Sequence, residues 1–325
     1  MRAAIRTSGG ISFSSVQPCA TPAAGQVLLH VMAAGVNPAD YKIPKIIGGK
    51  VVGLDVAGTV EACGPGVTNF AKGNEVFGFA LIGNGGIADY ALADATKITR
   101  KPTDLSWTAA GSLATAFLTS YQCLREHGGM AAGHSVLIIG ASGGCGTAGV
   151  QLAKAMGASE VVAVCSRANA ELVTELGATR VVDYRDTKAF EAMRTSSRFD
   201  IIYDCATGSG AGEDYSRDAQ AMLKPGGTVV AINGGLTAWL RLLLRCQSAH
   251  RKLMLTRQNG EELDAILHLL GDTAKDAVII DSTHEISEGG VAAAFQRVKS
   301  RRARGKVVFD ATIGRERLTE VRIGT

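Results

Sequence analysis

The stretch SVLIIGASGGCGTAGVQLAKAMGA (135–158) decides the fold. Residues 136–139 form a short apolar run of strand type, a glycine-rich turn follows, and the remainder has the period of an amphipathic helix. Gly140, Gly143 and Gly146 are spaced G-x-x-G-x-x-G, which differs from the usual G-x-G-x-x-G of dinucleotide-binding turns. The succession of strand, glycine turn and long helix nevertheless predicts a nucleotide-binding βαβ unit.

The glycine turn is the expected contact with the pyrophosphate of a dinucleotide. In a βαβ unit, backbone N–H groups and the positive end of the helix face the phosphates at this turn. Gly143, Gly144 and Gly146 carry no Cβ and permit that approach, and we assign Ser142 and Cys145 of the same turn to the cofactor as well. The alternative is a turn that serves only close strand–helix packing, because altered spacings are weakly specific. The order of the surrounding elements favours the cofactor.

Beyond residue 135, strands alternate with helices. The strand patterns are SVLIIG, EVVAVCS, RVVDY, FDIIYDCA and GGTVVAING, with helical AELVTELGA and DAQAMLKPGG between them. Such alternation predicts an α/β domain, a doubly wound parallel sheet covered by helices on both faces. After a helix at about 261–270, AVIIDSTHEI and KVVFDA are expected to be strands that return to the first domain.

The first hundred residues show short β patterns separated by Gly, Pro and Asn. QVLLHVMAAGV (26–36), VVGLDVAGTVEAC (51–63) and GNEVFGFAL (73–81) are the clearest. Helical periodicity is scarce there, so the sequence predicts a compact, irregular β domain. A helix is then expected from Ser106, as N-cap, to roughly Cys123.

Composition excludes several classes of protein. The chain has 325 residues, 46% of them hydrophobic, and a formal net charge of only +4, which indicates no nucleic-acid platform. The seven cysteines are scattered without a C-x-x-C motif, as is typical of reduced thiols, and predict a cytoplasmic protein. No apolar run approaches 18 residues, and the N-terminus has the pattern of neither a signal nor a transit peptide.

The end of the second strand of the alternation predicts the cofactor. An NAD-binding unit places an acidic residue about 20 residues beyond the turn to bind the ribose hydroxyls. Here Ser166 and Arg167 stand at that position, and Tyr184 ends the third strand. A hydroxyl with a guanidinium binds a 2′-phosphate that a carboxylate would repel, so we expect NADPH. A solvated loop arginine is the alternative for Arg167.

Eight motifs in order along nearly the whole chain resemble the zinc-free quinone oxidoreductases of the medium-chain dehydrogenase/reductase superfamily. They are GVNPADYK, GLDVAGTVEACGPGV, GNEVFGF, GGIADYALA, GASGGCGTAGVQLAK, VCSRAN, VVDY and ARGKVV. The chain is most similar to the alkenal/quinone reductases of chloroplast envelopes and to the reticulon-interacting mitochondrial enzymes. The resemblance implies a GroES-like substrate domain from residues 1–118 and 272–325, an inserted Rossmann domain of residues 119–271, and a cleft where they meet.

The resemblance also bears on the metal and the substrate. Zinc-dependent relatives carry Gly-His-Glu at the position of Gly53-Leu54-Asp55 and a four-cysteine lobe, and this sequence has neither. Without a Lewis acid an alcohol is hard to polarise for hydride removal. We therefore expect no metal and a small hydrophobic acceptor that is already electrophilic: a quinone, or an alkenal or enone reduced at its C=C bond. The alternative is an NADPH-binding interaction protein of the same fold with little turnover.

Three catalytic residues follow from the resemblance. Asn37 and Lys42 of NPADYK lie at the cleft by analogy with related reductases, where Lys42 is expected to donate to the substrate carbonyl or to the nicotinamide ribose. Thr119 matches a family threonine beside the nicotinamide. A solvated surface lysine and a helix hydroxyl bonded to its own preceding turn are the respective alternatives.

The remaining cofactor residues are assigned in the same way. Cys205 ends the fourth strand, where the family contacts the nicotinamide, and Asn233 follows the fifth. Cys145 and Cys205 have no nearby histidine in sequence, so both are interpreted as structural thiols rather than nucleophiles. In RRARGK (301–306) the family position brings Arg304 close to NADPH, whereas a localisation or nucleic-acid patch is the less favoured interpretation.

The segment AWLRLLLRCQSAHRK (238–252) is both apolar and cationic. The resemblance implies a lid or interface over the cofactor cleft, and a helix at a membrane surface is the less favoured alternative. An edge strand near KLMLT (252–256), together with the resemblance, predicts a homodimer.

Overall fold

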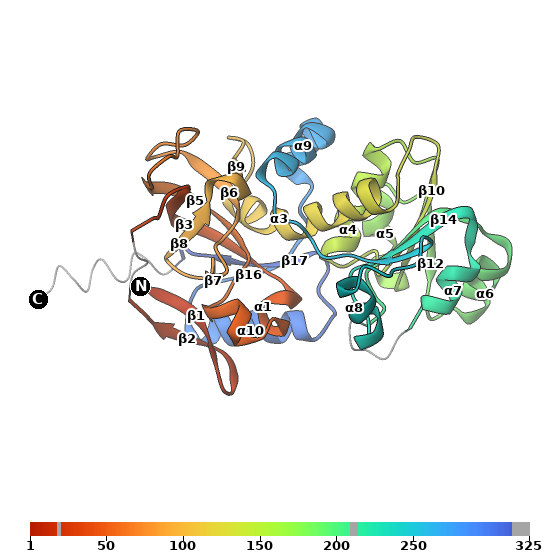
Figure 1. Cartoon of the computed structure of the whole chain (residues 1–325). Coiled ribbons are helices and arrows are strands. Elements are labelled where there is room, and N and C mark those ends of the chain that lie inside the picture. Colours follow the sequence, from red (N-terminus) through yellow and green to blue (C-terminus); the bar gives the residue numbers. More distant parts are fainter. Residues whose placement is uncertain (18–20, 209–213, 314–325) are drawn as a thin grey trace, which may run out of the picture. The chain divides into compact units, whose positions relative to one another are not determined.

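The computed structural model describes residues 1–17, 21–208 and 214–313 (Figure 1). The chain divides into two compact units, and each is described by itself. The first comprises Met1–Thr115 and the chain from Gln258 onward, and the second comprises Ala116–Arg257.

The first unit is built on two sheets. The seven-stranded sheet has β3 at its centre, in the order β16 (Ile280–His284), β17 (Lys306–Asp310), β3 (Gln26–Val36), β5 (Asp55–Cys63), β6 (Glu75–Phe79), β9 (Ile98–Arg100), and β8 (Tyr90–Asp94) also pairs with β3. The four-stranded sheet has the order β2 (Gly10–Ser15), β1 (Arg2–Thr7), β4 (Gly49–Val51), β7 (Gly83–Asn84). Buried valines, leucines and alanines of the larger sheet pack with α10 (Glu288–Lys299) into the core of this unit.

The predicted strand 26–36 is confirmed as β3, but the predicted strand 51–63 is divided. The chain leaves β4 at Val51 and enters β5 only at Asp55. Gly53 between them has a φ of +110°, a conformation that glycine adopts readily and other residues avoid. The two pieces therefore join different sheets, and the link between them runs past the segment that contains Asn37 and Asp40.

Short helices complete the first unit. They are α1 (Pro38–Lys42), α2 (Lys45–Gly48), η1 (Ala95–Lys97), α9 (Gly260–Leu270), η4 (Gly271–Asp276) and α10. The sequence-based boundary at 271/272 assigned α9 to the nucleotide domain, whereas the structure assigns it to the first unit. The reason is packing: α9 lies against β9 and η1, and a Cβ on Gly260 would overlap the carbonyl of Ile98.

Helix α3 (Trp107–Gln122) begins in the first unit and continues into the second. Its predicted N-cap is confirmed, because the Ser106 hydroxyl accepts a hydrogen bond of 3.2 Å from the N–H of Ala109. A π-helical turn, η2 (Cys123–His127), follows directly. The unit boundary within α3 falls at 115/116, a few residues before the predicted one.

The second unit is a six-stranded sheet in which every neighbouring pair is parallel. Its order is β12 (Arg180–Asp183), β11 (Glu160–Cys165), β10 (Ser135–Ile139), β13 (Phe199–Asp204), β14 (Leu223–Ala231), β15 (Arg251–Leu253). The helices are α4 (Gly144–Ala155), η3 (Arg167–Asn169), α5 (Ala170–Glu175), α6 (Thr187–Ser196), α7 (Ser216–Ala221) and α8 (Leu236–Leu243). This is the strand order of a Rossmann fold, which binds its ligand at the carboxyl ends of the strands beside the first one.

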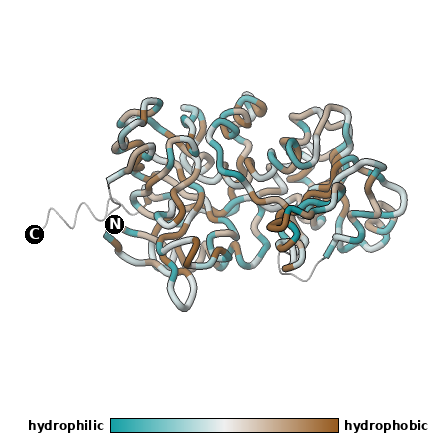
Figure 2. The backbone as a smooth tube through the Cα atoms, in the orientation of Figure 1, coloured by the Kyte–Doolittle hydropathy of each residue, from teal (hydrophilic) through white to brown (hydrophobic). Residues whose placement is uncertain are grey.

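Helix α8 differs from the other helices of this unit in its exposure. Figure 2 shows it as largely hydrophobic, yet Leu236 and Leu243 are each 76% exposed, and Leu240 and Leu244 are exposed as well. The helix lies next to β15, the edge strand of the sheet. No helix within the described ranges is long and apolar enough to cross a membrane.

Candidate nucleotide and acceptor sites

The turn between β10 and α4 presents the start of a helix without a side-chain cap. Gly143 precedes the helix with extended backbone angles and has no side chain to accept from the first-turn N–H groups. Such groups have no acceptor within the helix itself. The N-terminal end of α4, with Gly144, Cys145 and Gly146 in its first turn, is therefore suited to bind an anion.

The structural need for glycine differs among the glycines of this turn. Gly140 has a φ of +81°, and a Cβ on Gly146 would overlap the backbone of Gly140 and Ala141. One turn later, a Cβ on Gly149 would lie 2.9 Å from the Tyr203 ring. These glycines serve the turn and the close packing of α4 on the sheet. Packing does not demand glycine at 143, where a Cβ would have an ordinary contact of 3.6 Å.

A side chain that sequence reasoning passed over joins this turn to the next strand. The Asn169 amide donates to the Ser142 hydroxyl at 2.9 Å and to the Ser166 hydroxyl at 3.2 Å. Two hydroxyls from separate loops are therefore held by one amide group. Asn169 is the last residue of the VCSRAN motif, and its place in that motif is the sequence feature that could have indicated its role.

The ends of β11 and β12 bring the expected adenosine-end residues together. Cys165 pairs directly with Asp183, so Ser166 and Arg167, which follow β11, lie beside Tyr184 and Arg185, which follow β12. Arg167, Tyr184 and Arg185 are all exposed. Arg185, which the sequence reasoning missed, lies over the Tyr184 ring at 5.3 Å from its centroid.

Asp183 places a carboxylate at the same edge. The oxygens of Asp183 accept from the backbone N–H groups of Arg185 at 2.9 Å and Arg167 at 3.0 Å. These hydrogen bonds, the one from Arg185 foremost, lower the pKa of Asp183. Asp183 thus fixes the backbone of both arginines, whose residues are exposed.

Two further expected residues lie at the carboxyl ends of β13 and β14. Cys205 follows β13, and its N–H donates to the Ile139 carbonyl at 3.0 Å. Asn233 follows β14, whose Ala231 pairs with Asp204. Burial raises the pKa of the Cys205 thiol well above its ordinary value, which makes it a poor nucleophile at neutral pH.

Thr119 lies on the part of α3 that belongs to the second unit. It is buried, and its hydroxyl is 2.6 Å from the Thr256 hydroxyl. Its neighbour Ser120, rather than Thr119, bonds back to the preceding turn, at the Ala116 carbonyl. The Thr119 hydroxyl therefore ties α3 to the segment after β15.

Asn37 belongs to a buried polar cluster of the first unit. The Lys306 ammonium donates to Asn37 Oδ1 at 2.5 Å and to Asp55 Oδ2 at 3.1 Å, and the Asn37 amide donates to the same Asp55 oxygen at 3.0 Å. The other Asp55 oxygen accepts from the N–H and the hydroxyl of Thr115. Asp55 and Lys306 lie within motifs of the sequence analysis but were not predicted as site residues. Their partners are remote in sequence, so the sequence does not show that they meet.

Lys42, by contrast, is exposed at the end of α1. Partial burial, and next the repulsion from Arg301, lower the pKa of its ammonium group. The lysine that bonds to Asn37 is therefore Lys306, and Lys42 is a separate cation on the surface of the same unit. Arg304, also exposed in this unit, donates its backbone N–H to Asp281 at 2.8 Å.

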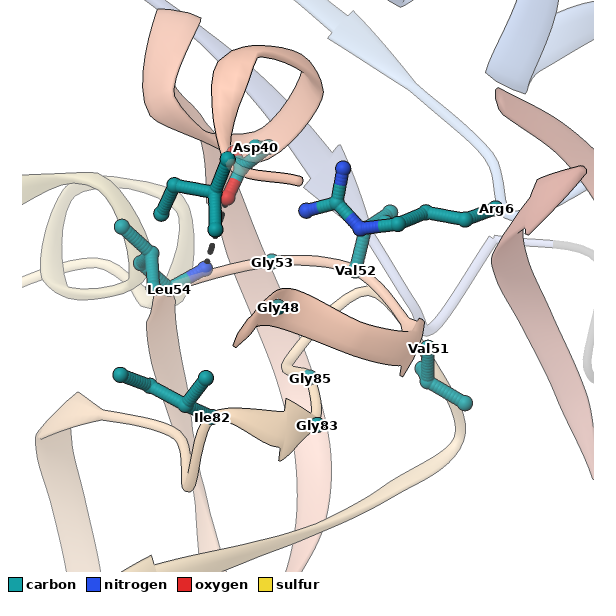
Figure 3. A pocket seen from close by; sticks show the side chains of 11 residues that line it. Arg6, Asp40, Gly48, Val51, Val52, Gly53, Leu54, Ile82, Gly83 and Gly85 are labelled. Atoms are coloured by element: carbon teal, nitrogen blue, oxygen red, sulfur yellow. Dashed lines mark hydrogen bonds between the residues drawn. The ribbon is translucent and has the colours of Figure 1, made fainter. Parts of the chain in front are cut away.

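Asp40 adds a second buried carboxyl near Asn37. Its oxygens accept from the backbone N–H groups of Asn37 at 2.7 Å and Leu54 at 3.0 Å, and Figure 3 shows the bond to Leu54. Burial raises the pKa of Asp40 to about 7, with a further contribution from the Asp55 charge. The carboxyl therefore changes its protonation near neutral pH while it holds the backbone on either side of the cluster.

The residues at the zinc position of related dehydrogenases do not fit a zinc ion. Leu54 has no donor atom, and the adjacent Asp55 is occupied by Lys306, Asn37 and Thr115. Throughout the part of the chain that the structure describes, no three His, Cys, Asp or Glu side chains are grouped as a metal would require.

Comparison with known proteins places these features in a family. Residues 23–103 match the model of the alcohol dehydrogenase GroES-like domain, and residues 176–309 match that of zinc-binding dehydrogenases. The match to the first model gives the β-rich unit its GroES-like character, as the sequence resemblance implied.

Individual relatives agree with this result. The chain is 34% identical to a 2-methylene-furan-3-one reductase of Solanum lycopersicum over 304 residues, which is 87% of this chain and 71% of that protein. It is 30% identical to the mitochondrial NAD(P)H oxidoreductase RTN4IP1 of Mus musculus over 326 residues, 88% and 81% of the two chains. The quinone oxidoreductase structure from Coxiella burnetii is similar with a TM-score of 0.79 and 27% identity, over 96% of this chain and 99% of that one. The chain belongs to the quinone oxidoreductase family of the medium-chain dehydrogenase/reductase superfamily, whose members are oxidoreductases that bind nicotinamide cofactors.

Proposed function

We propose that this protein is an NADPH-dependent reductase of quinones or α,β-unsaturated carbonyl compounds that acts without a metal ion. The observation that carries the cofactor assignment is the pair of guanidinium groups, Arg167 and Arg185, at the adjoining ends of β11 and β12. A 2′-phosphate with nearly two negative charges is stabilised there by charge-assisted hydrogen bonds, and a free ribose hydroxyl gains much less.

The remaining cofactor residues fit an extended dinucleotide. The uncapped start of α4 suits the pyrophosphate, and the hydroxyls of Ser142 and Ser166, held by Asn169, suit the neighbouring ribose and phosphate oxygens. Cys205 and Asn233 lie at the ends of the next two strands, where the nicotinamide side is expected. We include Arg304 as a further contact to the cofactor, as the family resemblance implies.

When bound, NADPH supplies a hydride, and a proton from solvent completes the reduction of the acceptor. We assign the acceptor side to Asn37, Lys42 and Thr119, as donors that stabilise negative charge on the carbonyl oxygen in the transition state. Lys306 and Asp55 act through Asn37: their hydrogen bonds hold its amide in one orientation. They are positioning residues for the site.

The acceptor class follows from the missing metal ligands and from the names of two relatives. One relative is a furanone reductase, which acts on a conjugated carbonyl, and one solved structure is a quinone oxidoreductase. Both classes of acceptor are electrophilic without a Lewis acid. We also propose a cytoplasmic protein, because the six cysteines within the described residues are all free thiols.

A stopped-flow assay tests the proposal. The protein is mixed with NADPH or NADH and a panel of quinones, alkenals and enones, and the loss of reduced-nicotinamide absorbance is followed. We expect turnover with at least one acceptor and a lower KM for NADPH than for NADH. NADPH binding without turnover of any acceptor would favour an interaction protein, and a preference for NADH would overturn the cofactor assignment.

A further inference from the structure

A small pocket in the first unit borders the buried polar cluster. Figure 3 shows it between α1, β4 and the segments around Gly53 and Gly85, with Arg6, Asp40 and Leu54 in its wall. Asp40 and Leu54 belong to the same two segments as Asn37 and Asp55. The pocket is therefore next to Asn37, whose N–H donates to Asp40, although Asn37 does not line it.

Arg6 is an unusual residue in this wall. It lies on β1, where Ala4 and Arg6 face inward two positions apart, and only 9% of Arg6 is exposed. Its guanidinium lies against Gly48, where a Cβ would come within 2.8 Å of an Arg6 nitrogen. Figure 3 shows the side chain extending past Val52 toward the side of the pocket where Asp40 lies. A side chain at position 48 would therefore overlap the guanidinium, and glycine avoids this overlap.

The Arg6 charge has no counter-charge among the residues that the structure describes. Its Nε has no hydrogen-bond partner, and its side chain forms no ion pair with any residue of the described ranges. Two other arginines of this unit show the usual arrangement: Arg2 is paired with Asp89 at 2.9 Å and Arg297 with Asp281 at 2.6 Å. Burial of a charge without a counter-charge costs desolvation free energy. An anion that binds in the pocket offsets much of this cost, because it supplies the counter-charge.

Asp40 does not fill this role, although it lines the same pocket. Both of its oxygens accept from backbone N–H groups, as described above, and it forms no ion pair with Arg6. The neighbouring Asp55 is already balanced by Lys306. The wall of the pocket therefore combines a cation without an ion pair among the described residues and a carboxyl, Asp40, whose oxygens are already bonded to backbone N–H groups.

The size of the pocket limits the anion. Its volume is about 10 Å³, close to the minimum that accepts one water molecule. A free phosphate or sulfate ion is too large to enter as a whole, whereas the flat carboxylate group of a larger molecule can face the guanidinium with one oxygen inside the pocket and the other at its mouth. Guanidinium and carboxylate also match in geometry, because both are planar and form paired hydrogen bonds.

We propose that Arg6 binds the carboxylate of the acceptor, so that the preferred substrates are conjugated carbonyl compounds with a free carboxylate. This inference rests on the proposed reductase function for the identity of the acceptor, while the carboxylate pocket itself is independent of turnover. Arg6 is then a specificity residue that selects acidic acceptors over neutral ones.

The kinetic test uses acetylacrylate, an enone with a carboxylate, and its neutral methyl ester, with NADPH. We expect kcat/KM of the wild type to favour the acid about tenfold or more. Arg6→Met should raise KM for the acid about ten- to a hundredfold and change that for the ester less than about threefold. Arg6→Lys should retain part of the preference because it keeps the charge. Lys50→Met, which removes an exposed cation on β4, is the matched control and should leave the preference unchanged.

A binding test is independent of activity. Acetylacrylate, added without NADPH, should raise the Tm of the wild type and not that of Arg6→Met. Arg6→Met without ligand should itself melt higher than the wild type, because an unpaired buried charge is replaced by an unbranched apolar side chain.

The outcomes separate the two proposals. Equal use of acid and ester by the wild type, or an equal effect of Arg6→Met on both, would overturn the assignment of Arg6. If acetylacrylate raises the Tm through Arg6 but neither these compounds nor any acceptor of the panel is reduced, the pocket stands and the reductase proposal fails. If Arg6→Met does not fold, the acid-to-ester ratio of the wild type and of Arg6→Lys still decides.

Discussion

The Lys306 ammonium lies 3.1 Å from a carboxylate oxygen of Asp55, and both side chains are buried in the first unit. This pair ties β17 to β5, and Asn37 and Thr115 form further hydrogen bonds with it. A buried ion pair contributes little net stability when its desolvation is counted, but removal of one partner leaves the other charge uncompensated. The loss of one partner alone is therefore expected to lower the stability of the protein more than the loss of both partners together.

Lys306→Met should lower the free energy of unfolding by about 3–5 kcal/mol, because it leaves the Asp55 carboxylate buried without its cation. Urea denaturation measures the change. Lys72→Met, which removes the partner of Glu61 in an exposed pair, is the control and should have little effect. Similar losses for the two variants would contradict a special role of the buried pair.

Arg167→Ala and Arg185→Ala should each raise KM for NADPH about ten- to a hundredfold and leave KM for NADH nearly unchanged. The reason is that only NADPH carries the 2′-phosphate. Initial rates with each cofactor measure the effect, and added salt should weaken NADPH more than NADH in the wild type. Arg180→Ala, at the opposite end of β12, is the matched control. If Arg167→Ala raised KM for NADPH and for NADH by the same factor, Arg167 would have a structural role instead.

The stability of the protein should depend on pH through Asp40. Because its pKa is raised to about 7 in the folded state, the folded protein holds a proton that the unfolded chain has already lost. The stabilisation by this proton is complete below pH 3.8, the ordinary pKa, and is lost as pH rises through about 7. Between pH 6 and 8 the free energy of unfolding should fall by about 1 kcal/mol from this group.

Urea denaturation at several pH values measures this dependence. Asp40→Asn serves as the comparison: its absolute stability changes because two backbone hydrogen bonds are affected, but the fall between pH 6 and 8 should disappear. An unchanged pH profile in the variant would show that another group titrates.

Chelation should have no effect on the protein. Incubation with EDTA, followed by removal of the chelator, should leave Tm and turnover unchanged, because Leu54 and the occupied Asp55 offer no zinc site. Elemental analysis of the untreated protein is the second measurement. One tightly bound zinc ion per chain would contradict the proposed metal-free mechanism.

We expect a homodimer that buries the exposed leucines of α8 beside the edge strand β15. Light scattering at micromolar concentration should give twice the mass of the chain. Leu243→Glu should shift the protein toward monomer, whereas Ile313→Glu, at an exposed residue of the first unit, should not. A wild-type protein that is only monomeric would end this proposal.

The sequence by itself determined the local elements and their order. The apolar run before Gly140, the glycine turn and the following helix predicted β10 and α4, and Ser106 predicted the start of α3. The alternation of strands and helices beyond residue 135 predicted the parallel sheet. Because no acidic residue follows β11, Ser166 and Arg167 were predicted as cofactor-binding residues. These features depend on residues within one or two turns of each other, so their patterns are visible along the chain.

The tertiary structure alone decided which distant groups meet. Lys306 and Asp55 are 251 positions apart, and Arg185 lies beside Arg167 only because β12 pairs with β11 in one register. The unpaired Arg6 could not be recognised from a strand pattern, because its lack of a counter-charge depends on what every neighbouring element places around it. Hydrogen bonds and ion pairs act over a few ångströms in space whatever the separation along the chain, so these partners are defined only once the chain has folded.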